Sequence, residues 1–83
     1  MRVNIKYFAS IREAIGSGAE SLETTAPTVA ALRDELIARG DGYAESLARG
    51  KTVRVALNQT LSDESASLVD GAEVAFFPPV TGG

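Results

Sequence analysis

The chain has 83 residues, a formal net charge of -3, and neither cysteine nor histidine. This length fits one small domain, and the negative charge argues against nucleic acids and anionic membranes as partners. Without Cys and His there are no thiol nucleophiles, no imidazole bases and none of the usual ligands of zinc, haem or iron–sulfur clusters. A Ser nucleophile would need Lys6 or Lys51 as its base, and these lie in unrelated segments. We therefore expect neither an autonomous enzyme nor a metal site.

The first segment predicts a strand, a short helix and a second strand. Residues 2–9 alternate polar and apolar side chains, which is typical of a strand and not of a signal peptide. Ser10 is expected to cap a short helix over residues 11–15, and Gly16 to end it. A weaker strand is expected over residues 20–25, so that the first two strands form a hairpin with a long connection.

The main helix is predicted over residues 29–40, with Thr28 as its N-cap and Gly40 at its end. Apolar residues recur along it at helical spacing, which predicts one buried stripe made of Val29, Leu32 and Leu36. Charged residues fill other positions of the same helix. We expect them to form a solvated face that comprises Arg33, Asp34, Glu35 and Arg39.

The second half of the chain predicts a short helix over residues 43–48 and strands over residues 52–57, 60–62 and 73–77. The element order predicts an α+β fold, in which one main helix covers one face of a mixed four- or five-stranded sheet. The first and last strands are both strongly apolar, so we expect them to be central neighbours. No segment approaches the length of a membrane helix.

The last residues predict a projecting tail. Pro78 and Pro79 end the last strand, since neither can donate to a ladder, and they favour an extended chain. We place the domain at residues 1–79 and a flexible tail at residues 80–83, which reaches at most about 13–14 Å. The terminal glycines have no Cβ and fit a narrow channel. This tail suits a carboxylate that is delivered into another protein's active site.

The sheet is expected to carry an apolar docking patch made by Phe8, Phe77 and Leu61. If Tyr7 and Phe76 face the helix, strand alternation sends the residue after each of them to the opposite face. One substantial helix leaves that face uncovered, so large apolar residues there indicate an interface. The alternative is that the short helices or a twisted strand end bury the two phenylalanines.

Four stretches of the chain resemble one known family: FASIREAIG, PTVAALRDEL, ALNQTL and, most specifically, the last fourteen residues, DGAEVAFFPPVTGG. The family is the small subunit of molybdopterin synthase, a ubiquitin-like sulfur carrier with the β-grasp fold. The resemblance spans essentially the whole chain. Carriers of this family dock on their partners through the sheet surface that corresponds to the predicted patch.

The resemblance implies a chemistry for the tail. An E1-like adenylyltransferase would use ATP to adenylate Gly83, and a sulfur donor protein would supply the sulfur that converts it to a thiocarboxylate. Pro79, Val80, Thr81 and Gly82 would lie in a channel of the large synthase subunit, which would hold the catalytic side chains. There the sulfur would pass to cyclic pyranopterin monophosphate to form the dithiolene of molybdopterin.

The lack of a signal-peptide pattern and of a membrane helix predicts a cytoplasmic protein. The resemblance implies that no cofactor is stably bound and that two small and two large subunits assemble. Three alternatives stay open. A sulfur carrier for thiazole or tRNA thiolation would use the same chemistry with another acceptor. A ubiquitin-like modifier would form isopeptide bonds from Gly83 to lysines. A plain binding module would not need Gly83 at all.

Overall fold

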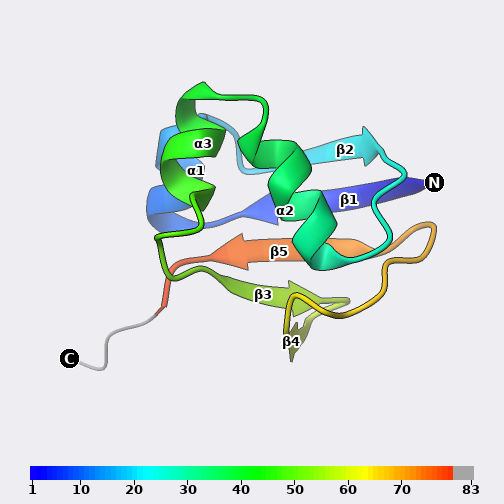
Figure 1. The fold of residues 1–83 in the computed structure, drawn as a ribbon. Coiled ribbons are helices and arrows are strands. Elements are labelled where there is room, and N and C mark those ends of the chain that lie inside the picture. The colour runs from blue at the N-terminus through cyan, green and yellow to red at the C-terminus, as the bar shows by residue number, and fades with distance from the viewer. Residues whose placement is uncertain (80–83) are drawn as a thin grey trace.

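The strands form one mixed five-stranded sheet in the order β2-β1-β5-β3-β4 (Figure 1). The structure is a computed structural model that describes residues 1–79. The neighbours β1 and β5 run parallel, and the other pairs are antiparallel. This confirms the α+β fold and the pairing of the first and last strands. The strands are β1 (Arg2–Tyr7), β2 (Ala19–Glu23), β3 (Arg54–Leu57), β4 (Thr60–Ser62) and β5 (Glu73–Phe77).

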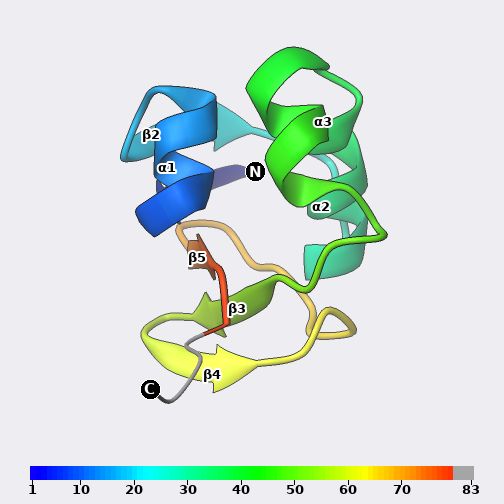
Figure 2. The same cartoon turned by 90° about the vertical axis from the view of Figure 1, so that its left-hand side faces the viewer.

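Helices cover only one face of this sheet, which we call the inner face (Figures 1 and 2). The main helix α2 begins as predicted at Thr28, whose side chain accepts a hydrogen bond from the backbone N–H of Ala31 at 3.2 Å. Within residues 1–79 no helix is long and apolar enough to cross a bilayer. The helices are α1 (Ala9–Ile15), α2 (Val29–Ile37) and α3 (Asp41–Leu47).

The corner between β1 and α1 lies earlier in the chain than predicted. The strand ends at Tyr7, and Phe8 is the N-cap of α1 with an extended φ of -128°. Ser10 lies inside the helix and does not cap it, because the carbonyl of Phe8 accepts the first two helical hydrogen bonds, from Ile11 and Arg12. Gly16 ends α1 in the left-handed region, as predicted. The corner leaves Phe8 exposed beyond the end of β1.

The other element ends shift by a few residues. Helix α2 ends at Ile37, and a turn leads to Gly40, which has a φ of 78° and is the N-cap of α3. The predicted role of Gly40 as the end of the main helix is therefore wrong, because Ala38 is the C-cap of α2 and Gly40 begins α3. Strands β2 and β3 are shorter than predicted, because residues 24–25 and 52–53 lie outside their ladders.

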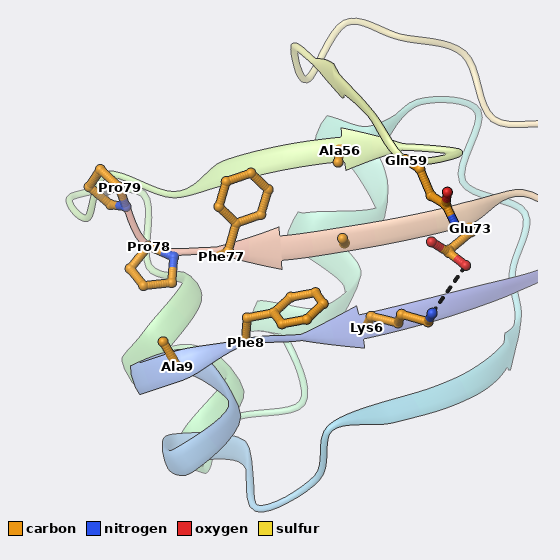
Figure 3. Close-up of a pocket in the computed structure, with 10 residues that line it drawn as sticks. Lys6, Phe8, Ala9, Ala56, Gln59, Glu73, Phe77, Pro78 and Pro79 are labelled. Carbon is orange, nitrogen blue, oxygen red and sulfur yellow. Dashed lines mark ion pairs between the residues drawn. The ribbon is translucent and has the colours of Figure 1, made fainter. Parts of the chain in front are cut away.

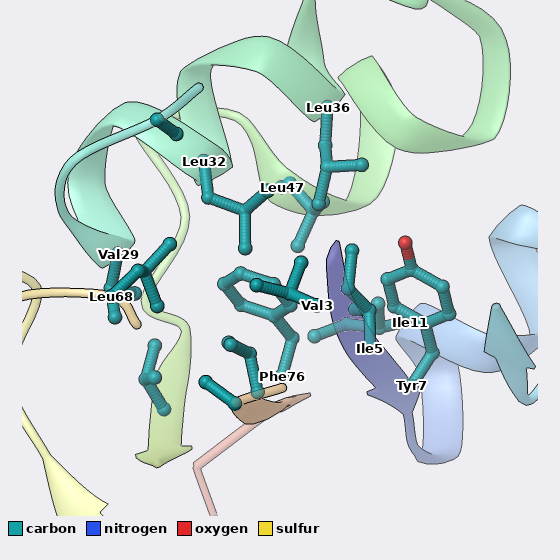
Figure 4. Close-up of a cluster of buried hydrophobic side chains, with 14 residues drawn as sticks. Val3, Ile5, Tyr7, Ile11, Val29, Leu32, Leu36, Leu47, Leu68 and Phe76 are labelled. Atoms are coloured by element: carbon teal, nitrogen blue, oxygen red, sulfur yellow. The ribbon is translucent and has the colours of Figure 1, made fainter. Parts of the chain in front are cut away.

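The core lies between the inner face and the helices (Figure 4). Alternate residues of β1 are buried, as strand alternation predicts, and so is the predicted stripe of α2. In β5 Val74 and Phe76 are fully buried, and the small Ala75 between them is buried as well. The fully buried side chains are Val3, Ile5, Tyr7, Val29, Leu32, Leu36, Leu47, Val74 and Phe76. Phe8 and Phe77, which follow Tyr7 and Phe76 in the chain, therefore lie on the opposite face, which we call the outer face.

The prediction of a solvated face on α2 is wrong for Arg33, which is only 3% exposed. Its guanidinium donates to the carbonyls of Leu47 and Ala48, both at 2.8 Å, and of Lys51 at 3.1 Å. It also donates to the carboxylate of Glu64 at 2.8 Å. Arg33 therefore holds the connection from α3 to β3 and, with it, the start of β3.

Candidate functional site

The outer face of the sheet has a row of small side chains at its centre. In register across β4, β3, β5 and β1 lie Leu61, Ala56, Ala75 and Lys6. Cross-strand partners point to the same face of a sheet, so all four side chains share the outer face. The two alanines in the middle leave space that larger residues on either side enclose.

This space is a hollow of about 770 Å³ on the outer face (Figure 3). The helices lie on the opposite face of the sheet (Figures 1 and 2), so they do not cover the hollow. Its lining is mostly apolar at the end where the tail leaves and polar at the other end. It consists of Lys6, Phe8, Ala9, Ala56, Gln59, Glu73, Ala75, Phe77, Pro78 and Pro79.

Phe8 and Phe77 flank the apolar end of the hollow (Figure 3). Phe8 is 46% exposed, and Phe77 at the end of β5 is half-buried. The backbone N–H of Phe8 donates to the carbonyl of Phe76 at 3.2 Å, which holds the two aromatic side chains at the same end of the sheet. Both phenylalanines thus lie on the outer face, outside the core. Their role in docking stays a prediction.

Leu61 lies on the same face but outside the hollow. It is 64% exposed on the edge strand β4, directly opposite Ala56. With the two phenylalanines it forms what we call the outer-face patch, made of Phe8, Phe77 and Leu61 around the alanine floor. The structure thus brings the three predicted docking residues to one uncovered face.

An ion pair at the polar end of the hollow was missed from the sequence. Lys6 Nζ lies 3.4 Å from Glu73 Oε1 (Figure 3). Strand alternation alone sends both side chains outward, but their contact depends on the parallel register in which Asn4 lies opposite Glu73. The pair neutralises two charges beside the hollow, so this end of the hollow is polar but carries no net charge from these two residues.

The base of the tail separates two hollows. Pro78 and Pro79 line the outer hollow, and they also line a second one of about 430 Å³ formed with α1, α3 and the α3–β3 connection. Pro79 is exposed and Pro78 half-buried. The predicted tail residues Val80, Thr81, Gly82 and Gly83 lie outside the described residues.

The strongest titration effects lie on the other face of the sheet. Burial raises the pKa of the Tyr7 hydroxyl, and its hydrogen bond to Glu20 adds to the rise. The pKa of the Glu20 carboxyl lies below its ordinary value. Burial alone would raise this pKa, but hydrogen bonds from Tyr43, Arg39 and Tyr7 stabilise the ionised carboxylate and outweigh the effect of burial. This cluster joins β1 and β2 to the end of α2 and the start of α3. In residues 1–79 no group of three or more acidic side chains is placed to hold a metal ion.

The sequence comparisons identify a family and a relative. The model of the ThiS family matches residues 5–83. The curated molybdopterin synthase sulfur carrier subunit of Escherichia coli K12 is 46% identical over 81 residues, which cover 98% of this chain and 99% of that protein. The resemblance drawn from the sequence is thereby confirmed.

Solved structures confirm the β-grasp, ubiquitin-like fold. One is the complex of subunits 1 and 2 of the molybdopterin-converting factor from Helicobacter pylori, with a TM-score of 0.71, 27% identity and full coverage of both chains. Another is SAMP1 from Haloferax volcanii, with a TM-score of 0.78, 25% identity and full coverage of both chains.

Proposed function

The chain belongs to the ThiS family, and we propose that it is the sulfur carrier subunit of a molybdopterin synthase. The observation that carries the proposal is the 46% sequence identity between this chain and a curated sulfur carrier subunit of that enzyme, over nearly the full length of both proteins. The solved complex of the two converting-factor subunits supports a large subunit as the partner.

We place the chemistry at Gly83. A carboxylate is a poor acyl electrophile, so the carboxylate oxygen first attacks the α-phosphate of ATP on an E1-like adenylyltransferase, and pyrophosphate leaves. Sulfur from a donor protein then displaces AMP, and the chain ends in a thiocarboxylate. This group is anionic and nucleophilic at sulfur, so a cationic pocket of the acceptor enzyme would bind and orient it. The acceptor in this proposal is cyclic pyranopterin monophosphate.

The outer-face patch is the docking surface in this proposal. Phe77 is separated from Pro79 by one residue, so a partner seated on the patch also contacts the base of the tail. The four residues after Pro79 reach at most about 13–14 Å. The catalytic side chains of the large subunit are therefore expected within that distance of Pro79. We expect two small and two large subunits in the assembly.

Deletion of Gly83 tests the proposed chemistry. The shortened chain should not become a thiocarboxylate when it is incubated with the adenylyltransferase, ATP and the sulfur donor, as intact mass would show. Its melting temperature should equal that of the full chain, because a terminal residue beyond the two prolines contributes little to the core. Normal sulfur transfer by a chain that ends at Gly82 would contradict the proposal.

A protein modifier is the second candidate, because the fold and 25% of the sequence are shared with SAMP1, the small archaeal modifier protein 1 of Haloferax volcanii. In that case Gly83 would form isopeptide bonds to lysines of other proteins. Intact mass of the protein purified from its own cells separates the two candidates. A free chain that carries a thiocarboxylate supports the carrier, and a ladder of conjugates supports the modifier. A carrier for thiazole or tRNA thiolation would purify without the large synthase subunit.

A further inference from the structure

Arg54 lies at the rim of the outer-face patch. It is the first residue of β3 and stands directly opposite Phe77 of β5. Residues opposite each other on neighbouring antiparallel strands share a face, with Cβ atoms about 4.5–5.5 Å apart. Arg54 is exposed. A partner that covers Phe77 must therefore also cover the side chain of Arg54.

The other charges of the outer sheet face are neutralised in pairs. Arg2 lies 3.2 Å from Glu23, and Lys6 lies 3.4 Å from Glu73. Within residues 1–79 Arg54 has no such ion pair. These strands therefore present three cations and two carboxylates on the outer face, which leaves one positive charge, although the whole chain carries -3. That charge lies beside the aromatic side chain nearest the tail.

A guanidinium that loses its water without gaining a partner is strongly destabilising. Its planar fork matches a carboxylate with two parallel hydrogen bonds. We propose that Arg54 pairs with a carboxylate of the protein that docks on the outer-face patch, and that it thereby selects a partner with an acidic side chain beside its aromatic-binding pocket. The inference rests on the proposed function, in which that partner is the large synthase subunit.

A second copy of this chain fits the patch less well. A symmetric dimer would place the same surface on both sides of the interface, so the unpaired guanidinium of each copy would meet a face that also carries excess positive charge. An apolar patch alone accepts many partners, whereas a charge next to it suppresses wrong partners and sets orientation. Arg54 is a specificity-determining residue in this view, and it takes no part in the sulfur chemistry.

Binding of the full chain to the large synthase subunit of the same source tests the inference. We expect Arg54→Ala to weaken binding about thirtyfold or more, mainly through faster dissociation, as for a buried charge pair that loses one partner. Arg54→Glu should weaken it further, and Arg54→Lys less, because lysine keeps the charge without the fork. The melting temperatures of all three variants should stay near that of the wild type, since Arg54 is exposed.

Arg2→Glu is the matched control. It makes the same change of net charge as Arg54→Glu at the far end of the sheet, and it should alter binding by less than about fivefold, as expected for exposed charges. If Phe77→Ala loses binding but neither Arg54→Ala nor Arg54→Glu differs from the wild type, the inference is wrong and the proposed function stands. If the wild-type chain does not bind the large subunit, both are wrong. A wild-type dimer that Phe77→Ala dissociates would also overturn the inference.

Discussion

The two faces of the sheet use the same strands for different purposes. On the inner face β1 and β5 contribute fully buried residues to the core, and every buried side-chain nitrogen and oxygen in residues 1–79 has a hydrogen-bond partner. On the outer face the next residues along the same strands surround an open hollow. Phe76 and Phe77 are adjacent in sequence and lie on opposite faces. In a small domain with few helices, one face of the sheet thus stabilises the fold, and the other is available for recognition.

The largest expected effect comes from truncating these two neighbours separately. Phe76→Ala should lower the free energy of unfolding by about 3–5 kcal/mol, because it opens a cavity in the core. Phe77→Ala should leave most of the stability intact and weaken binding of the large subunit by about 2 kcal/mol, roughly thirtyfold. Chemical denaturation and titration calorimetry on both variants measure the two quantities.

The reverse outcome would show that the two faces do not divide these roles. If Phe77→Ala collapses the melting temperature and leaves binding unchanged, Phe77 belongs to the core and the outer-face patch does not exist. Phe8→Ala provides a further check, since it should behave like Phe77→Ala in both measurements.

The next effect concerns the buried arginine behind the inner face. Arg33→Met should lower the free energy of unfolding by about 2–4 kcal/mol, because the buried carbonyls of Leu47 and Lys51 lose the guanidinium as their donor. The carbonyl of Ala48 keeps only its hydrogen bond from the backbone N–H of Lys51. Arg12→Met on the exposed side of α1 is the control and should change stability by less than about 0.5 kcal/mol. Equal melting temperatures for the two variants would mean that Arg33 is not a structural clamp.

A smaller effect is expected where α1 and α3 approach each other. A Cβ at Gly42 would lie 1.9 Å from the carbonyl oxygen of Ala14, so Gly42→Ala must push the helices apart. We expect a loss of about 1–3 kcal/mol in the free energy of unfolding, as for overpacking. Gly50→Ala is the control, since a Cβ there meets no atom within 4 Å. Similar denaturation midpoints for both variants would show that this helix contact adapts without cost.

The smallest effect is a dependence of stability on pH. The pKa of Glu20 is lower in the folded chain than its ordinary value of 4.5. Its stabilising effect is therefore complete above that value and is lost as the pH falls through the lower folded pKa. Glu20→Gln should flatten the stability profile below about pH 4.5, because it removes this carboxylate. Urea denaturation at several pH values measures the free energy of unfolding. If that free energy depends on pH in the same way for Glu20→Gln and the wild type, the prediction is wrong.

Local patterns predicted much of this fold. Alternation in residues 2–7 and 73–77 assigned each side chain to a face, because the period of a strand is set by the chain itself. Thr28 as an N-cap and Gly16 as a helix end follow from local backbone hydrogen bonding and from the freedom of glycine at positive φ. The same reasoning placed Phe8 and Phe77 outside the core. The tail residues 80–83 were also singled out from their sequence alone, and they stay a prediction.

Tertiary structure decided the features that depend on pairing between distant segments. Arg33 looked like part of a solvated face, but three carbonyls from a later connection surround its guanidinium. The ion pair of Lys6 with Glu73 exists because β1 and β5 are parallel neighbours in one particular register. The position of Arg54 beside Phe77 depends in the same way on the register of β3 against β5. A sequence determines the direction of a side chain through local geometry, whereas its neighbours are chosen by long-range packing that no local period contains.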